Sequence, residues 1–371
     1  MDFQKEFPLN DDILYLNHAA VAPWPQRTQQ AVQKFATENT TVGSKHYLKW
    51  LEIEQNLREK LSTLVGAQSS NEIALLKSTS EGLSTIAYGL EWQAGDEVII
   101  SNEEFPSNRI VWQSLANQGV KVVEVDLQGD HLQNISNAMT NKTRLLAISS
   151  VQYASGRVIN LEALGQLCTQ HNVLYCIDAI QSLGVMPFNA KAYNADFVVA
   201  DGHKWMHGPE GLAVFYCRKA AQDQLKLNQY GWHMVEDAGN FDNKNWTIAN
   251  NAKRFECGSP NMLGAHALDA SLSLILEIGA EQIFKLTQAL HGYLREQLTE
   301  AGFTVLNATE PFCGITTFKT SAKDHKELYQ KLMAHNVICA PRGGGIRFSP
   351  NFYQDKLVID KAIALIKTLL Q

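Results

Sequence analysis

The stretches that decide the fold are residues 173–182, VLYCIDAIQS, and residues 196–205, DFVVADGHKW. Each begins as an apolar run of the kind that forms a strand buried on both faces of a parallel sheet. The first run ends at Asp178, and Lys204 follows the second run within four residues. Because the carboxyl ends of parallel strands meet at one edge of a sheet, these two side chains are predicted to share one site.

Short apolar runs alternate with longer amphipathic runs over the whole chain, which predicts an α/β fold with a mostly parallel central sheet. After Pro260 a long helical stretch leads into a second, shorter α/β pattern. We therefore expect a large domain over residues 21–265, a smaller C-terminal α/β domain over residues 266–371, and an N-terminal segment, residues 1–20, packed beside the small domain. The predicted strands are 97–101, 121–125, 145–151, 173–178, 197–201, 212–216 and 315–319, and the predicted helices are 26–37, 48–65, 81–90, 109–118, 161–171, 264–278, 283–301, 326–335 and 357–370.

Composition narrows the class of protein. The chain has 371 residues, of which 45% are hydrophobic and 19% charged, the balance of a globular protein with a large core. Its net charge is −6 and no basic stretch occurs, so neither nucleic acid nor a membrane is an expected partner. No run is apolar enough to span a bilayer, and the first residues lack the apolar core of a signal peptide. We therefore expect a cytoplasmic protein.

The six cysteines, at positions 168, 176, 217, 257, 313 and 339, are widely spaced and show no metal-ligand pattern. We interpret them as structural thiols in a reducing compartment. His203 and His207 stand four residues apart, but Gly208-Pro209 opposes a helix there and no third ligand is evident. No metal site is therefore expected.

Lys204 and Asp178 together indicate a specific chemistry. A lone lysine is most often a solvated surface charge, but this one follows a buried strand, and partial desolvation lowers the pKa of an amine and frees it to condense with an aldehyde. A carboxylate at the end of the neighbouring strand, otherwise an ordinary turn or cap aspartate, can hold a pyridine nitrogen protonated. Gln181 is placed to reach the ring oxygen. The pair predicts a pyridoxal 5'-phosphate site in an enzyme that acts on an amino compound.

A phosphate site is predicted at residues 78–81, STSE, which precede an apolar-periodic helix. Ser78 and Glu81 have the spacing of a capping box. Hydroxyl groups and free backbone N–H groups at a helix start favour an anion, and His203 is placed to donate to the same phosphate. The alternative is an ordinary helix N-cap without a ligand.

Two further side chains complete the predicted pocket. Phe105 comes just after a strand and is the candidate to stack on the pyridine ring; the alternative is a core phenylalanine. Arg347 lies where residues 342–349 become strand-like, and its guanidinium matches a carboxylate bidentately. The alternative for Arg347 is a structural salt bridge.

With these residues assembled, the chain resembles the class V aminotransferase family of fold-type I pyridoxal-phosphate enzymes. That family includes the group II cysteine desulfurases, isopenicillin N epimerase-like proteins and related carbon–sulfur lyases. The resemblance covers nearly the whole chain and is carried by residues 15–20, 78–81, 104–108, 178–181, 202–204 and Arg347.

The resemblance implies roles position by position. Arg347 would bind the substrate carboxylate, and Ser259, in a segment that reaches the neighbouring subunit in this family, would touch the partner's phosphate. The protein would then be a homodimer with shared active sites. The implied cofactor contacts are Lys204 at the aldehyde carbon, Asp178 at the pyridine nitrogen, Gln181 at the phenolic oxygen, Phe105 on the ring face, Tyr153 near the cofactor oxygen, and Thr79, Ser80 and His203 at the phosphate.

Several positions depart from the group II desulfurases. Phe105 stands where those enzymes usually carry a histidine, and Tyr153 where they commonly have an asparagine. Asp201 replaces a phosphate-binding serine, so its carboxylate is expected to point away from the phosphate or to pair with a base. Cys339 lies in a strand-like run rather than on a mobile loop. A thiol fixed on a strand argues against desulfurase activity.

The sequence therefore predicts a pyridoxal-phosphate enzyme acting on the amino group of an amino acid or related amine, with an aminotransferase-like reaction as the main interpretation. The alternative is a carbon–sulfur lyase or cysteine desulfurase-like enzyme, and a second alternative is a non-catalytic sensor that binds the cofactor or an amine. Transamination, β-elimination and racemisation stay open, as does the substrate. No G-x-G-x-x-G motif supports a nicotinamide-dependent dehydrogenase.

Overall fold

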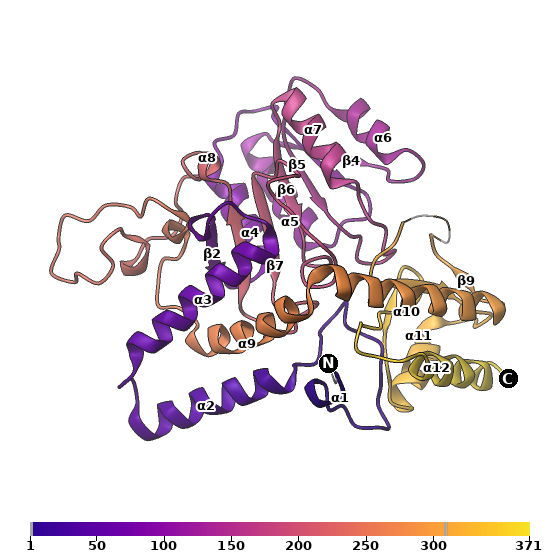
Figure 1. Cartoon of the computed structure of the whole chain (residues 1–371). Helices are drawn as coiled ribbons and strands as arrows, with labels where there is room; N and C mark the ends of the chain where they lie inside the picture. Colours follow the sequence, from indigo (N-terminus) through magenta and orange to yellow (C-terminus); the bar gives the residue numbers. More distant parts are fainter. Residues whose placement is uncertain (1–2, 308, 310) are drawn as a thin grey trace.

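The computed structural model describes residues 3–307, 309 and 311–371, and a seven-stranded sheet forms the centre of its larger part (Figure 1). The strand order is β2-β8-β7-β6-β5-β3-β4. The strands from β7 to β4 are parallel, whereas β8 runs antiparallel to both of its neighbours, which confirms the predicted mostly parallel sheet. These strands are β2 (Ile73–Leu76), β3 (Glu97–Ser101), β4 (Lys121–Val125), β5 (Thr143–Ser149), β6 (Leu174–Asp178), β7 (Phe197–Asp201) and β8 (Ala213–Cys217).

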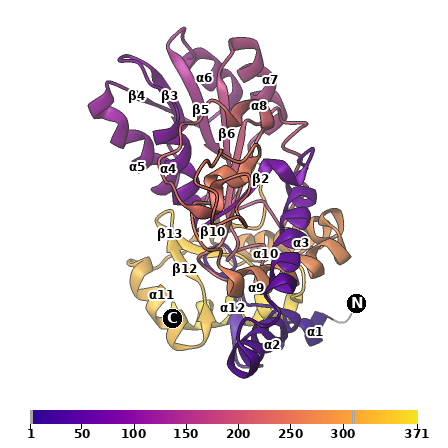
Figure 2. The same ribbon diagram turned by 90° about the vertical axis from the view of Figure 1, so that its left-hand side faces the viewer.

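Helices cover both faces of this sheet, and alternate residues of its strands enter two separate cores. On β7, Val198 and Ala200 belong to one core, while Phe197 and Val199 belong to the other. Residues of α3, α7 and α9 fill the first core and residues of α4 and α5 the second, on opposite sides of the sheet (Figure 2). Burial on both faces is why these strands read as continuous apolar runs. The helices are α1 (Phe3–Glu6), α2 (Gln26–Val42), α3 (Tyr47–Val65), α4 (Thr79–Gly89), α5 (Ser107–Gln113), α6 (His131–Ala138), α7 (Leu161–His171), α8 (Lys219–Gln222), α9 (Met262–Ile278), α10 (Ala280–Glu300), α11 (His325–Ala334) and α12 (Lys356–Leu369).

A second, four-stranded sheet with order β12-β13-β10-β9 packs against α10, α11 and α12 around its own core. A short parallel pair joins β1, near the N-terminus, to β11. The predicted boundary at residue 265 falls inside α9, and the division into residues 1–20, 21–265 and 266–371 stays a prediction. The remaining strands are β1 (Leu14–Tyr15), β9 (Thr304–Val305), β10 (Thr316–Lys319), β11 (Val337–Ile338), β12 (Ala340–Arg342) and β13 (Gly345–Phe348).

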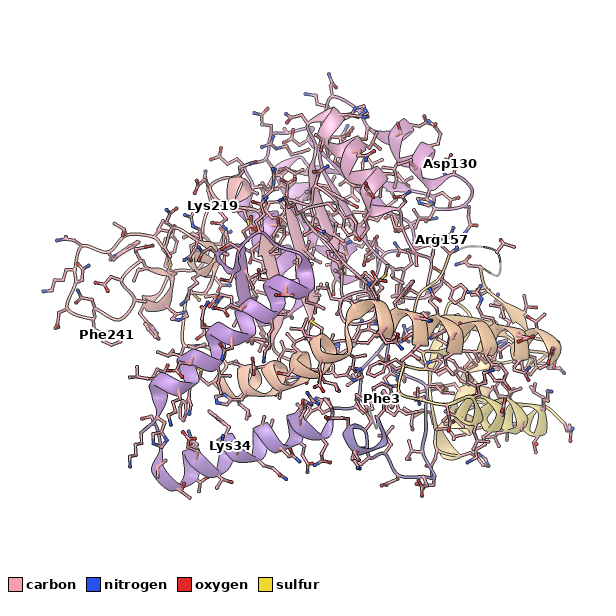
Figure 3. All side chains as sticks on the ribbon, viewed as in Figure 1. Phe3, Lys34, Asp130, Arg157, Lys219 and Phe241 are labelled. Carbon is pink, nitrogen blue, oxygen red and sulfur yellow. The ribbon has the colours of Figure 1, made fainter. Side chains whose placement is uncertain are left out.

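One loop lies outside this layered plan. Between β8 and α9, a loop projects from the molecule with Phe241 near its tip (Figure 3). Helices α9 and α10 together have the length and apolar composition of a membrane span, but they bend by 81° at their junction; no single helix of the described residues passes that test. α9 packs against α2 and α3.

Candidate active site

A cavity of about 260 Å³ lies at the carboxyl ends of β6 and β7. Asp178 is the last residue of β6, Asp201 is the last residue of β7, and Lys204 follows three positions later. The fold therefore brings nine of the ten predicted site residues to one cavity. Those nine are Thr79, Ser80, Phe105, Tyr153, Asp178, Gln181, His203, Lys204 and Arg347.

Ser259 is the exception. It lines a different cavity, of about 450 Å³, together with Cys257 and Asn261. Within one chain it does not reach the Lys204 cavity, so its predicted contact with a phosphate requires a second copy of the protein.

The surroundings of Lys204 favour its neutral amine. The side chain is partly open to the cavity, yet closely packed protein lowers the pKa of its amine through desolvation; the negative charge of Asp178 opposes this shift, and the positive charge of Arg347 adds to it. Nζ lies 5.8 Å from the centre of the Phe105 ring. A neutral amine is the form that attacks an aldehyde carbon.

Asp178 is 2% exposed. Its Oδ1 accepts a hydrogen bond of 3.1 Å from the backbone N–H of Ile180. Burial raises the pKa of this carboxyl, and the negative charge of Glu104 raises it further. A protonated pyridine nitrogen beside Asp178 would supply the positive charge that the carboxylate lacks.

The amide of Gln181 is held by groups from two distant segments. Its Nε2 donates to the carbonyl of Ala19 at 3.0 Å, and its Oε1 accepts from the indole N–H of Trp205 at 2.8 Å. Since an amide nitrogen carries two hydrogens, one donor remains for a ligand in the cavity. This is compatible with the predicted contact to a phenolic oxygen.

The start of α4 has the geometry of an anion site. Ser78 caps the helix by accepting a hydrogen bond from the backbone N–H of Glu81. The Glu81 carboxylate returns to the backbone N–H of Lys77, one residue before the position expected in a capping box. The first backbone N–H groups of a helix have no partner within it, so those of Thr79 and Ser80 are available to a phosphate. Thr79 Oγ1 also accepts from the backbone N–H of Asp201 at 3.0 Å.

Asp201 and His203 form a close pair, as expected for a carboxylate near a phosphate site. Oδ1 of Asp201 lies 2.9 Å from Nδ1 of His203. Neither atom has a well-aligned hydrogen bond elsewhere among the described residues. The contact directs the other ring nitrogen away from the carboxylate, and a protonated His203 would offset the carboxylate's repulsion of a phosphate.

Phe105 lines the cavity and is 40% exposed, and its ring makes an edge contact with that of Tyr153 at 5.2 Å between centroids. It is therefore not a core phenylalanine. The turn that carries Phe105 is fixed by its neighbour Glu104, a buried carboxylate that sequence reasoning missed. Glu104 accepts hydrogen bonds from the side chains of Ser101, Asn108, Ser149 and Gln152 and from the backbone N–H of Ser149.

Arg347 lies on β13 and is 2% exposed. Its Nη1 donates to the carbonyl of Tyr153 at 2.7 Å, while its Nε has no partner among the described residues. No carboxylate of the described residues forms a salt bridge with it, which contradicts the structural salt-bridge alternative. Burial lowers the pKa of its guanidinium to about 9, as expected for a buried cation that lacks an anion. Arg342 also lines the cavity and is a second residue that sequence reasoning missed.

The sequence of the chain matches a known protein family. A sequence profile of the family described as Aminotransferase class-V matches residues 14–345. The chain belongs to this family. It is therefore an enzyme of a pyridoxal-phosphate-dependent class, and when bound the cofactor supplies an electron sink for negative charge at the substrate Cα.

Curated relatives of this class V chain are named for sulfur chemistry. A probable cysteine desulfurase of Methanothermobacter thermautotrophicus is 29% identical over 354 residues, covering 92% of this chain and 86% of that protein. A cysteine desulfurase of Escherichia coli is 28% identical over 319 residues, covering 82% and 77%.

Solved structures confirm the fold-type I architecture. A cysteine desulfurase from Thermococcus onnurineus NA1 superposes with a TM-score of 0.89 at 24% identity, covering 99% of this chain and 97% of that one. A cystine C–S lyase in complex with its reaction product, cysteine persulfide, superposes with a TM-score of 0.89 at 22% identity, covering 97% and 98%.

The described residues fit pyridoxal phosphate on grounds independent of these likenesses. The amine of Lys204, whose pKa is lowered by burial to about 8, faces the cavity, and Asp178 has one carboxylate oxygen without a partner from the described protein groups. Unpaired helix N–H groups lie at the start of α4, beside His203. The Lys204 amine matches the aldehyde of the cofactor, the Asp178 carboxylate matches its ring nitrogen, and the anion site at the start of α4 matches its phosphate.

Proposed function

We propose that the protein is a carbon–sulfur lyase that removes a sulfur group from the β-carbon of an amino acid by elimination. The names of the curated relatives support carbon–sulfur chemistry more than the amino transfer that the sequence first suggested. The observation that carries the proposal is the position of the cysteines, which favours elimination over desulfuration.

None of the six cysteines, all within the described residues, lines the Lys204 cavity of its own chain, and only Cys257, which lies beside Ser259, is not buried. Cys339 lies between β11 and β12 and is 2% exposed, and burial raises the pKa of its thiol to about 12. Only a thiolate attacks sulfur, so a buried neutral thiol is a poor acceptor. Elimination needs no protein thiol, because the sulfur leaves with its own electron pair.

L-Cystine illustrates the balance of such a reaction. Lys204 Nζ accepts the proton from Cα, the Cβ–S bond breaks, and its electron pair leaves on sulfur, which is then protonated. With one water, cystine gives pyruvate, ammonia and cysteine persulfide, and no external oxidant or reductant is required. Asp178 would hold the charge at the ring nitrogen, Gln181 would orient the phenolic oxygen, and Arg347 would hold the α-carboxylate.

The test is to incubate the purified, cofactor-loaded protein with L-cystine, L-cysteine or L-alanine plus a 2-oxo acid, and to measure pyruvate, ammonia and persulfide. We expect all three products from cystine in equal amounts, without added reductant. Lys204→Ala should lose this activity and the absorbance band of the lysine-linked cofactor, while Cys339→Ala should keep both. Transfer of the amino group to the 2-oxo acid would restore the aminotransferase interpretation. Turnover of cysteine that depends on Cys339, or on Cys257, which the proposed second copy would carry to the site with Ser259, would establish a desulfurase.

A cofactor-binding sensor is a further alternative. It predicts a normal absorbance band that none of these amino acids changes. The cytoplasmic location also stays a prediction, which fractionation of the source cells would test.

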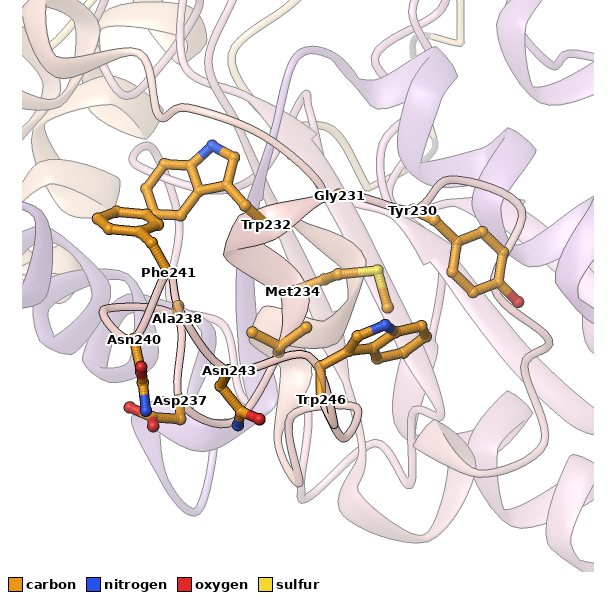
Figure 4. Close-up of a pocket in the computed structure, with 11 residues that line it drawn as sticks. Tyr230, Gly231, Trp232, Met234, Asp237, Ala238, Asn240, Phe241, Asn243 and Trp246 are labelled. Atoms are coloured by element: carbon orange, nitrogen blue, oxygen red, sulfur yellow. The ribbon is translucent and has the colours of Figure 1, made fainter.

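We also propose a homodimer with shared sites, because Ser259 lies outside the Lys204 cavity of its own chain. A second copy is the occupant that fits the projecting loop, whose cavity is lined by aromatic side chains such as Trp232, Phe241 and Trp246 (Figure 4). Phe241 is 80% exposed and Trp246 is 53% exposed, which is unusual for two large apolar side chains in one loop. Sedimentation velocity should give twice the chain mass, and Trp246→Asp should shift the protein towards monomer.

A further inference from the structure

A buried cluster of polar side chains lies away from the Lys204 cavity, at the base of the projecting loop. Glu54 of α3, Glu256 and His233 are 3%, 7% and 6% exposed. One carboxylate oxygen of each glutamate and one ring nitrogen of His233 all lie within 4.8 Å of one another. Buried carboxylates need positive charge or hydrogen-bond donors, so the partners of this cluster indicate what it can bind.

Arg58 compensates the two carboxylates only in part. Its Nη2 donates to Glu54 Oε1 at 2.7 Å and more weakly to Glu256 Oε2 at 3.2 Å, and its Nη1 donates to Glu256 Oε1 at 2.6 Å. Two carboxylates beside one guanidinium leave one negative charge of the cluster uncompensated. The second oxygen of Glu54 accepts no hydrogen bond from the described residues. The cluster can therefore accept a further cation.

His233 directs a ring nitrogen without a hydrogen bond into this cluster. It belongs to a short 3₁₀ helix, Trp232–Met234, whose other two residues line the loop cavity (Figure 4), whereas His233 does not. Nδ1 of His233 has no hydrogen-bond partner among the described residues. Oε2 of Glu256 is 3.7 Å from this nitrogen. That distance is too long for a hydrogen bond, but it is close to the separation of two ligands that are each bound at about 2.1 Å to one tetrahedral metal ion.

The cluster is accessible, and its donor atoms select among metals. Glu54 and Glu256 line the cavity of about 450 Å³ that also contains Ser259, so an ion and a water ligand can reach them. One imidazole nitrogen with two carboxylates suits Zn²⁺ or another divalent transition metal, whereas Mg²⁺ and Ca²⁺ prefer oxygen ligands alone. Arg58 would orient both carboxylates from behind, as groups around metal ligands commonly do.

We propose that Glu54, His233 and Glu256 bind one divalent transition-metal ion, with Zn²⁺ as the best match, and that this ion fastens the base of the projecting loop. His233 precedes the loop, Glu256 follows it, and Glu54 belongs to α3. The ion would join these three segments, which are distant in sequence. The site lies in a different cavity from Lys204 and does not depend on the proposed lyase activity.

Zinc binding is measured by calorimetry on the cofactor-loaded protein after treatment with EDTA and removal of the chelator. The parent protein for this test is Cys257→Ser, because Cys257 is the one cysteine that is not buried and it lines the same cavity. We expect one Zn²⁺ per chain with a Kd of about 1 µM or below, and a higher melting temperature with zinc than with EDTA. Mg²⁺ at the same concentration should produce neither effect.

Two variants of this parent test the ligands. His233→Gln should weaken zinc binding about 100-fold, because it removes the nitrogen ligand and keeps an uncharged side chain. Glu54→Gln should weaken it about tenfold or more, while Arg58 still pairs with Glu256 and supports the fold. His171→Gln is the matched control, since His171 is an exposed histidine at the end of α7, and its affinity should stay close to that of the parent.

The outcomes are distinct. No one-to-one zinc binding by the parent at about 10 µM metal, or unchanged binding in His233→Gln or Glu54→Gln, overturns the proposal. Where one of these variants fails to fold, the other decides. Binding of Mg²⁺ as strong as that of Zn²⁺ would overturn the assignment to a transition metal. None of these results bears on the lyase proposal, which is tested by its products.

Discussion

Asp178 is a carboxyl group whose protein surroundings oppose its charge. It is almost fully buried, only Oδ1 accepts a hydrogen bond from a described protein group, and burial together with Glu104 raises its pKa. Such a carboxylate is stabilised when a cation is placed beside it, and the ring nitrogen of pyridoxal phosphate becomes that cation when protonated. The same contact would keep the ring able to accept electrons.

Asp178→Asn should therefore reduce turnover by about 100-fold or more, because an amide cannot hold the ring nitrogen protonated. Asparagine keeps the size of the side chain and the oxygen that accepts the N–H of Ile180, so the fold should persist. Steady-state kinetics measure the loss, and circular dichroism together with cofactor titration verifies folding and loading. A variant with near-normal turnover would remove Asp178 from the mechanism.

The β12–β13 hairpin positions both arginines through its turn. Gly343 and Gly344 have φ angles of 58° and 72°, as a two-residue hairpin turn with positive φ at both central positions requires. A Cβ at Gly344 would meet only the end of Lys319, at 3.6 Å or more, so backbone conformation rather than space restricts this position.

Gly344→Val should destabilise the turn by about 1–2 kcal/mol and weaken amino acid binding, because a β-branched residue strongly disfavours this conformation. Gly344→Asn is the matched variant, since asparagine tolerates positive φ, and it should stay close to the wild type. Denaturant unfolding and titration with L-alanine give the two readouts. Equal behaviour of the two variants would show that the turn does not set the position of the arginines.

Three buried histidines join the N-terminal segment, the large sheet region and the C-terminal part. Both ring nitrogens of each histidine lie within hydrogen-bond distance of a partner. His18 has the carbonyl of Ser349 at 2.7 Å and the hydroxyl of Tyr353 at 2.6 Å. His207 has the carbonyl of Pro23 and the amide of Asn351, and His291 has the hydroxyl of Thr316 and the carbonyl of Pro350. Burial lowers the pKa of all three, to about 4 for His207 and His291. Each is therefore neutral in the folded protein at neutral pH.

Stability should fall as the pH drops from about 6.5 to about 4. In that window the unfolded chain binds protons at these histidines and the folded protein does not, so acid favours unfolding. The raised pKa of Asp178 acts in the opposite direction, but it is one group against three. Melting temperatures of the cofactor-free protein at pH 7, 6 and 5 should decrease in that order, and less steeply in His291→Asn. A melting temperature that rises towards pH 5 would contradict this account.

The strands and the ends of the strands were predictable from the chain alone, because strands buried on both faces leave continuous apolar runs. Phe197–Asp201 is found where the pattern places it, and Leu174–Asp178 begins one residue later than predicted. Parallel strands present their carboxyl ends at one edge, so the sequence alone predicts that Asp178 and Lys204 share one site, and both line the same cavity. The short strand β2 was missed, since its four residues lack a distinguishing period.

The partners of the polar side chains were decided only by tertiary packing. Glu104 accepts hydrogen bonds from residues at the ends of two strands and from a residue of a helix. Gln181 donates to the carbonyl of Ala19, which is distant in the sequence. Ser259 lines a different cavity from Lys204. That no described carboxylate pairs with Arg342 likewise emerges only when the hairpin register and the cavity are known together. Periodicity reports which face of an element is buried, whereas hydrogen-bond partners depend on contacts between residues distant in sequence.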